Sequence, residues 1–198
     1  MAPKTALLVV DMQRFFESMT TTAVPNIKKL ITQFQSSSSP IIFTQHGHSK
    51  EELTANPSPN QLVRKWGPGG SIAYGSDEWQ FQTEIKKYVD GSKSGAGATG
   101  WPKVVAKNTY DAFINTNLQE VLTEAKTERV VVCGVMTDCC CDTTARAAFN
   151  RGFETWLVSD ACGSANKTQH QAGLKGFGFA FGEVLTADEA VAALKRGE

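Results

Sequence analysis

The sequence has no long apolar run, no net charge and no regular set of cysteines. Its first apolar run, Ala6 to Val10, is shorter than the roughly 7 to 15 residues of a signal-peptide core and the roughly 20 of a membrane span. The 20 Lys and Arg residues balance the 20 Asp and Glu residues, so no overall field favours nucleic acid or an anionic membrane. Five cysteines, an odd number, do not fit a secreted disulfide framework. We therefore expect a cytoplasmic protein without a signal peptide, whose partner is a small molecule and neither nucleic acid nor a membrane.

Short β-branched runs alternate with helix-like stretches along the chain. With 198 residues, 41% of them hydrophobic, the chain is expected to form one domain over residues 1–198. The apolar runs do not alternate with polar residues, which is typical of parallel strands buried on both faces. The pattern predicts an α/β fold. The expected strands are 6–10, 41–44, 104–106, 130–133, 155–158 and 183–185, and the expected helices are 24–35, 116–125, 138–151, 168–175 and 187–195.

Three segments allow finer predictions. In the stretch 138–151, Cys141, Ala145, Ala148 and Phe149 follow the spacing of one buried helix face. The segment 47–90 is long for a connection and is expected to fold over a site as a lid or binding loop. The segment 92–100 is expected to be a surface loop.

Reactive side chains follow several of the expected strands. Ligands collect at the carboxyl ends of parallel strands, so a carboxylate, a lysine and a thiol are predicted to meet at one edge of the sheet. Each also has an ordinary explanation, since an Asp after a strand is often only a helix cap and a Lys there is often a solvated charge. Lys103, at the other end of the third strand, is the weaker lysine candidate. The candidates are Asp11, His46, His48, Lys107, the segment 134–141 and Asp160.

The three adjacent cysteines, Cys139 to Cys141, cannot act together if they lie on a helix. Successive side chains then point about 100° apart, so the thiols can neither converge on a metal ion nor easily form a disulfide. A thiol in the first helical turn is expected to have a lowered pKa. Cys141, on the apolar face, is expected to pack in the core, as are Cys133 and Cys162. At most one of the three adjacent thiols can face the edge of the sheet, and for Cys140 a functional role begins to be favoured over packing.

These motifs resemble the isochorismatase-like cysteine hydrolases, which include nicotinamidase, N-carbamoylsarcosine amidase and isochorismatase. The resemblance rests on "LLVVDMQRFF" at 7–16, "VVAKNTYDAF" at 104–113 and "VVVCGVMTDCCCDTTARAAFNRGFETWLVSDAC" at 130–162. It implies a three-layer α/β/α fold with a six-stranded parallel sheet, and an assembly of two or four copies. It also implies a catalytic triad, main-chain oxyanion donors at Met136 and Cys140, and a cis peptide between Val135 and Met136. The triad residues are Asp11, Lys107 and Cys140.

The resemblance does not imply a cofactor, and the chain departs from the metal motif of nicotinamidases. Those enzymes carry Asp-x-His after the second strand and a further His downstream, whereas this chain has "TQHGH" at 44–48. His46 replaces the Asp, and only His48 matches. His46 and His48 are therefore weak metal candidates, no metal is expected, and nicotinamidase activity is not favoured.

Three functions stay open on the sequence. Cys140 favours cleavage of a C–N bond in a small amide or carbamoyl compound through a thioester. The alternative within the family is hydrolysis of the vinyl ether of isochorismate to pyruvate and 2,3-dihydro-2,3-dihydroxybenzoate. A third possibility is a thiol redox sensor or binding module without turnover. Expected substrate-pocket residues are Gln13, Phe16, Trp66 and Tyr110, with Phe15 beside them, while Arg14, Arg64 and Lys65 are expected to be surface charges.

Overall fold

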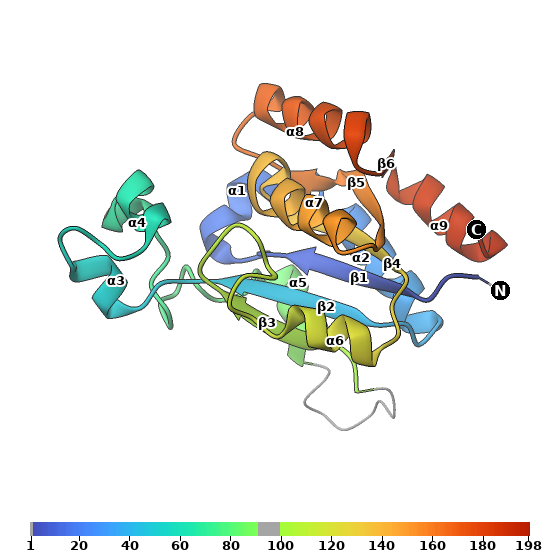
Figure 1. Ribbon diagram of the computed structural model, residues 1–198, viewed down its shortest axis with the longest axis horizontal. Coiled ribbons are helices and arrows are strands. Elements are labelled where there is room, and N and C mark those ends of the chain that lie inside the picture. Colours follow the sequence, from blue (N-terminus) through green and yellow to red (C-terminus); the bar gives the residue numbers. More distant parts are fainter. Residues whose placement is uncertain (1, 91–99) are drawn as a thin grey trace.

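A parallel sheet of six strands forms the centre of the protein. The computed structural model describes residues 2–90 and 100–198. The strand order is β3-β2-β1-β4-β5-β6, and neighbouring strands pair in parallel (Figure 1). The strands are β1 (Thr5–Val10), β2 (Ile41–His46), β3 (Lys103–Lys107), β4 (Arg129–Val135), β5 (Glu154–Gly163) and β6 (Glu183–Leu185).

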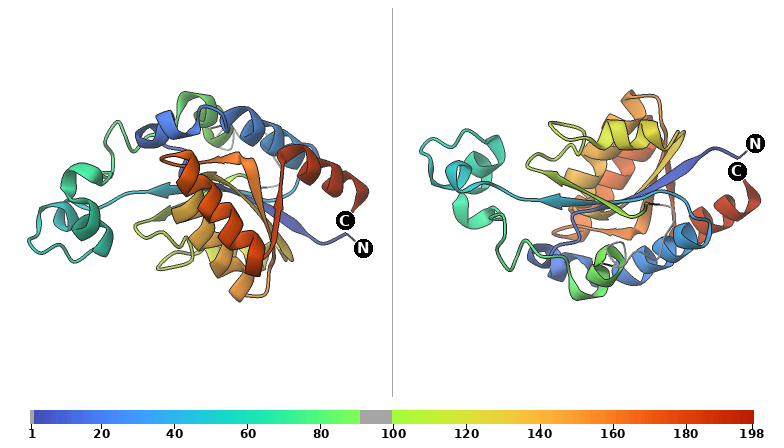
Figure 2. Two further views of the ribbon diagram at one scale, coloured as in Figure 1. Left: turned by 90° about the horizontal axis from the view of Figure 1, so that it is seen from above. Right: turned by 90° about the horizontal axis from the view of Figure 1, so that it is seen from below.

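Helices cover both faces of the sheet, as the two views of Figure 2 show. One apolar cluster joins the sheet to α1 (Glu17–Thr20), α2 (Val24–Ser36), α5 (Thr83–Asp90) and α9 (Ala187–Arg196). The other joins it to α6 (Leu118–Glu124), α7 (Asp142–Asn150) and α8 (Lys167–Ala180). Alternate residues of β1 enter the two clusters, Leu7 and Val9 one and Leu8 and Val10 the other. The predicted three-layer α/β/α fold is confirmed.

Burial of both faces explains why β1, β2 and β4 are apolar without alternation, whereas the edge strand β3 has Val104 exposed. Every residue of β1, β2 and β4 is buried. A strand with one solvated face would carry polar side chains at every second position.

The segment between β2 and β3 divides into two parts. Helices α3 (Lys50–Thr54) and α4 (Gln61–Trp66) form an arm that projects from the body at the side where the strands end (Figure 1). The following α5 packs on the sheet. The surface loop expected at 92–100 lies, except for Gly100, outside the described residues.

The predicted helix at 138–151 differs from the structure in two ways. It begins as a π-helical turn, Thr137–Cys141, before α7. The buried face of α7 includes Thr144, whereas Phe149 is 43% exposed, so the placement of Phe149 in the core was wrong. Thr144 is polar, yet it can be buried because its hydroxyl has two hydrogen-bond partners. The hydroxyl donates to Tyr110 O at 3.2 Å and accepts from Ala112 N at 3.1 Å. This rotates the buried face away from Phe149.

Within residues 2–90 and 100–198, the helices are too short or too polar to span a lipid bilayer.

Candidate active site

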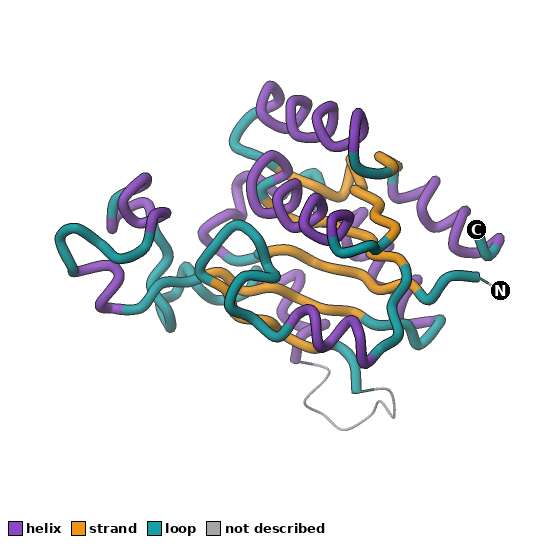
Figure 3. The backbone as a smooth tube through the Cα atoms, viewed as in Figure 1, coloured by secondary structure: helices purple, strands orange, loops and turns teal. Residues whose placement is uncertain are grey.

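Loops gather at the carboxyl ends of the strands, where Figure 3 shows them crossing between sheet and helices. Asp11 is the first residue after β1 and has φ 49°, in the left-handed region. Thr44 of β2 holds it, since its hydroxyl accepts from Asp11 N at 3.1 Å and donates to Asp11 Oδ1 at 2.6 Å. The neighbouring strand thus fixes both the backbone and the carboxylate of Asp11, which is fully buried.

Lys107 ends β3 and reaches across β2 to Asp11. Its Nζ lies 2.7 Å from Asp11 Oδ2, and neither side chain is exposed to solvent. The same ammonium donates to Thr109 O at 2.9 Å and lies 3.4 Å from Cys140 Sγ. Lys107 is therefore not a solvated charge but half of a buried ion pair beside a thiol.

Gly134 allows the turn that carries Cys140 to approach β1. It has φ 120°, and a Cβ there would lie 2.7 Å from Val10 N and closer still to Val10 O. No side chain fits, so only glycine permits this passage. The cis peptide expected between Val135 and Met136 follows directly. Met136 O then accepts from the N–H groups of Cys139 and Cys141, both at 3.1 Å, which closes the turn around Cys140.

The protonation states of the three reactive groups depend on one another. Burial raises the pKa of Asp11, but Lys107 and His46 outweigh it, so the pKa lies below its usual value. Burial lowers the pKa of Lys107, but the opposing effects of Asp11 and Cys140 are larger. The net pKa therefore lies above the usual value, and the amine stays protonated. Burial raises the pKa of the Cys140 thiol, and the opposing effect of Lys107 does not restore it. The resting site holds a carboxylate, an ammonium and a neutral thiol, contrary to the lowered thiol pKa expected from the helix start.

An apolar cavity of about 270 Å³ opens above Cys140. Trp66 of the arm and Tyr110 meet at its wall, where Trp66 Nε1 donates to Tyr110 Oη at 2.8 Å. Among the described residues that line the cavity, none is Lys, Arg, Asp or Glu. The lining residues are Phe15, Phe16, Met19, His46, His48, Leu62, Trp66, Gly70, Ser71, Ile72, Tyr110, Met136, Cys139, Cys140 and Ala165.

Three of the four expected pocket residues line this cavity, and Gln13 does not. Gln13 is fully buried behind the wall, where its Nε2 donates to His46 O at 2.9 Å and its Oε1 accepts from His46 N at 2.8 Å. Sequence reasoning missed Leu62, although it lies four residues before Trp66 on the same face of α4. It also missed Cys139, which lines the cavity and is half-buried.

The other candidates lie outside the cavity. Asp160 Oδ1 accepts from Ala187 N at 2.7 Å and so serves the start of α9, which is its ordinary explanation. Lys103 Nζ lies 3.6 Å from Glu124. Arg14 pairs with Asp77, and Lys65 lies over the Trp66 ring at 5.8 Å from its centroid. Cys133, Cys141 and Cys162 are buried free thiols, as expected.

His46 and His48 do line the cavity, and they face each other. The two Nε2 atoms are 3.0 Å apart. Burial and the charge of Lys107 lower the pKa of His46 to about 3, and burial also lowers the pKa of His48, so both rings are neutral at pH 7. In the part of the chain that the structure describes, no three His, Cys, Asp or Glu side chains cluster as metal ligands would.

Comparison with known proteins agrees with this architecture. The model of the isochorismatase domain matches residues 5–189. The chain belongs to the isochorismatase family. It is 35% identical to Nicotinamidase 3 of Arabidopsis thaliana over 184 residues, which cover 93% of this chain and 85% of that protein. The protein is therefore a hydrolase of this family, which argues against a thiol sensor without turnover.

Solved structures of the family share the fold. A cysteine hydrolase from Pseudomonas syringae pv. phaseolicola superposes with a TM-score of 0.79 at 23% identity, covering 98% of this chain and 94% of that one. N-carbamoylsarcosine amidase from Thermoplasma acidophilum superposes with a TM-score of 0.74 at 24% identity, covering 94% and 98%. At these identities the likeness concerns the fold alone.

Proposed function

We propose that this isochorismatase-family protein hydrolyses a C–N bond of a small uncharged amide, with Cys140 as nucleophile, Asp11 as proton carrier and Lys107 as the fixed charge between them. The observation that carries the proposal is the buried Asp11–Lys107 ion pair of 2.7 Å, with the Cys140 sulfur 3.4 Å from the same ammonium. A carboxylate, an ammonium and a thiol in mutual contact, with the thiol lining a cavity, suit acyl transfer through a thioester.

In the first half-reaction, the Asp11 carboxylate takes the proton of the Cys140 thiol as the sulfur attacks the amide carbon. The thiol interacts with this carboxylate in the resting site, so the proton has a short path. The protonated carboxyl then gives the proton to the leaving nitrogen, the C–N bond breaks, and a thioester and an amine remain. In the second half, Asp11 takes a proton from water, the hydroxide oxygen attacks the thioester, and the sulfur leaves and regains the proton.

The raised pKa of the thiol fits this order of events. A free thiolate would place a second negative charge in a buried site beside Asp11. If proton transfer accompanies attack, the negative charge moves onto the carbonyl oxygen instead. We propose that the main-chain N–H groups of Met136 and Cys140 receive that oxygen, a contribution typically worth about 3 kcal/mol per donor.

The character of the cavity supports an uncharged substrate. Isochorismate carries two carboxylates, and burying an anion without a partner is costly. The described residues lining the cavity include no lysine or arginine, and Lys107, which contacts the lining residue Cys140, is already paired with Asp11. A compact amide with an apolar or aromatic body fits this lining better than a dianion does.

The experiment is a panel of small amides assayed for ammonia, with isochorismate assayed for pyruvate. Nicotinamide comes first because of the similarity to Nicotinamidase 3, although the departure from the metal motif does not favour it. We expect ammonia from at least one aromatic or apolar amide. Pyruvate release without any ammonia release would overturn the proposal in favour of the vinyl ether reaction.

Single substitutions test the roles proposed for Cys140 and Asp11. We expect Cys140→Ala to abolish amide turnover and Asp11→Asn to lower it by about 10²- to 10⁴-fold, because each removes a partner of the proton transfer. Cys162→Ala is the matched control, since this buried cysteine does not line the cavity. Turnover that survives Cys140→Ala but disappears in Asp11→Asn would point to an acid-only mechanism without a thioester.

A further inference from the structure

A line of polar contacts runs from Lys107 through both histidines to the arm. Lys107 Nζ lies 3.5 Å from His46 Nδ1, and His46 Nε2 lies 3.0 Å from His48 Nε2. His48 Nδ1 in turn lies 3.5 Å from Glu52 Oε2. His46 and His48 are 7% and 1% exposed, so these contacts lie among protein groups rather than in bulk solvent.

The two ends of this line fix which ring nitrogens carry hydrogen. A nitrogen facing an ammonium presents its lone pair, which places the hydrogen of neutral His46 on Nε2. A nitrogen facing a carboxylate presents its N–H, which places the hydrogen of neutral His48 on Nδ1. The 3.0 Å contact then joins the N–H of His46 to the lone pair of His48. The contacts of His46 with Lys107 and of His48 with Glu52 therefore give the contact between the two rings one donor and one acceptor.

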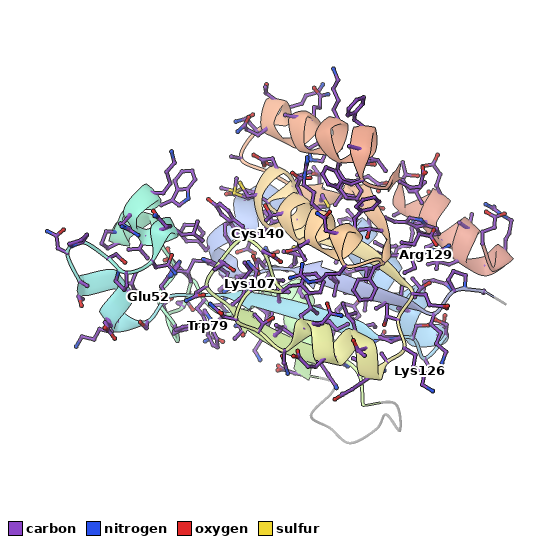
Figure 4. The ribbon with its side chains drawn as sticks, in the orientation of Figure 1. Glu52, Trp79, Lys107, Lys126, Arg129 and Cys140 are labelled. Carbon is purple, nitrogen blue, oxygen red and sulfur yellow. The ribbon has the colours of Figure 1, made fainter. Side chains whose placement is uncertain are left out.

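Glu52 anchors the far end as an ionised hub. Its Oε2 accepts from Ser49 N at 2.8 Å, and its Oε1 accepts from the amides of Asn60 and Asn108, both at 2.8 Å. Asn60 is the N-cap of α4, and Asn108 follows Lys107 directly. Glu52 therefore ties the arm both to His48 and to the strand end that carries Lys107. Figure 4 shows Glu52 on the arm at the side facing Lys107 and Cys140.

At the near end of the chain, His46 accounts for the third N–H group of the Lys107 ammonium. The Lys107 ammonium has three N–H groups, of which Asp11 Oδ2 and Thr109 O take two. The third has two possible acceptors, the Cys140 sulfur at 3.4 Å and the His46 lone pair at 3.5 Å. His46 offers this hydrogen a partner while the sulfur is a neutral thiol, which is a poor acceptor.

These donors do not fit the metal site that nicotinamidases carry at the positions matching residues 46–48. Among the described residues, no His, Cys, Asp or Glu side chain completes with these two histidines a group of three that could hold a metal ion. A metal would need lone pairs on both Nε2 atoms, and Lys107 and Glu52 favour a hydrogen on one of them.

We propose that Glu52, His48 and His46 form a positioning chain of polar contacts that holds the Lys107 ammonium from the arm, where nicotinamidases carry a metal ion. The three are positioning residues, because they act on Lys107 rather than on the substrate. The chain orients the third N–H of Lys107 toward His46 at rest and frees it for the sulfur when negative charge develops there. Its effect on turnover rests on the function proposed above.

The tautomers test the chain without any substrate. The sequence contains 3 histidines, so the full-length protein labelled with ¹⁵N-histidine gives three ring systems, and a His170→Gln variant identifies the third. We expect His46 protonated on Nε2 alone and His48 on Nδ1 alone at pH 7. The opposite tautomer in either ring, or a doubly protonated ring, would overturn the proposal.

Adding Zn²⁺ or Mn²⁺ to the same labelled sample tests the metal alternative. We expect the ring signals of His46 and His48 to stay unchanged in stoichiometric metal, and the metal content after dialysis to be well below one per chain. Loss of the His46 Nε2 proton on stoichiometric binding would show that these residues are metal ligands and would overturn the chain.

Glu52→Gln tests the consequence for catalysis. A glutamine keeps the shape but turns an N–H₂ group either toward His48 Nδ1 or toward the amides of Asn60 and Asn108, so one set of donors loses its acceptor. We expect kcat to fall roughly 10- to 100-fold with KM little changed, as for a displaced catalytic group. The histidine signals should shift in the same variant.

Glu189→Gln is the matched control, because Glu189 closes the same kind of capping box on α9, far from the site. It should leave kcat and the histidine signals unchanged. Equal effects in both variants, with both folded by circular dichroism, would reduce Glu52 to a helix cap and overturn the proposal. Correct tautomers without turnover of any amide would instead count against the proposed function and leave the chain standing.

Discussion

At the residue scale, the buried Asp11–Lys107 pair determines what the other groups can do. Burial alone would favour a neutral carboxyl and a neutral amine, yet each keeps the other charged across 2.7 Å. With both charges in place, the thiol is held neutral by burial and by the nearby carboxylate. A cysteine in this position depends on proton transfer to Asp11 during attack, and not on a standing thiolate, for its reactivity.

Replacing Asp11 with Asn is predicted to cost both stability and activity. The ammonium of Lys107 would remain buried without its counter-charge, and breaking such a pair typically costs about 3–5 kcal/mol. Loss of the proton carrier should lower kcat by about 10²- to 10⁴-fold. Urea denaturation and the ammonia assay measure the two effects.

A matched ion pair on the surface provides the control. Lys29 and Asp188 lie 2.6 Å apart with side chains 44% and 83% exposed. Asp188→Asn should change the free energy of unfolding by less than about 1 kcal/mol, since solvent screens exposed pairs. Similar losses in the two variants would mean that burial does not strengthen the Asp11 pair.

At the element scale, apolar runs and strand ends carried most of the predictive information. Asp11 directly follows one apolar strand and Lys107 ends another, so their meeting at one edge could be predicted from the rule for parallel sheets. The π-helical turn at Thr137–Cys141 could not, because main-chain contacts to Met136 O define it. The hydrogen bonds between Gln13 and the main chain of His46 could not be predicted either, and neither could the burial of Thr144. In both cases the polar side chain finds its partner in a segment distant in the sequence.

Gly134→Ala is predicted to destabilise the protein by roughly 3 kcal/mol or more and to abolish activity. The added Cβ would collide with the backbone of Val10, next to Asp11, and would push β4 and the Cys140 turn away from β1. Gly152→Ala is the control, because Gly152 also has positive φ, 89°, but open space around its Cβ position. That variant should lose only about 1 kcal/mol, through backbone strain alone. Equal losses in urea denaturation would show that strain rather than close approach governs Gly134.

At the scale of the whole molecule, the arm and the sheet make one site from distant segments. Asp11, Lys107 and Cys140 come from three strand ends, while Trp66 and Glu52 come from the arm between β2 and β3. The arm therefore supplies both the cavity wall at Trp66 and, through His48, the contact to the catalytic edge. A single domain, a cytoplasmic setting and association into two or four copies stay predictions.

The stability of the whole protein is predicted to fall as the pH is lowered from about 6.5 toward 4. The pKa of His46 is about 3 in the folded protein against an ordinary 6.5, so below 6.5 the unfolded chain binds a proton that the folded chain excludes. The free energy of unfolding should then fall by up to about 1.4 kcal/mol per pH unit for this residue, and further for His48, whose pKa is lowered in the same direction.

The contribution of Asp11 has the same sign but belongs to a lower pH. Its pKa is also lowered, so its stabilisation is complete above the ordinary value of 3.8 and is lost only as the pH falls below that value. The two groups can therefore be separated by urea denaturation at pH 7, 6, 5 and 4. His46→Gln should remove part of the slope between pH 6.5 and 4, a range in which Asp11 does not contribute. An unchanged slope in this variant would show that His46 titrates alike in the folded and unfolded chain, against its burial beside Lys107.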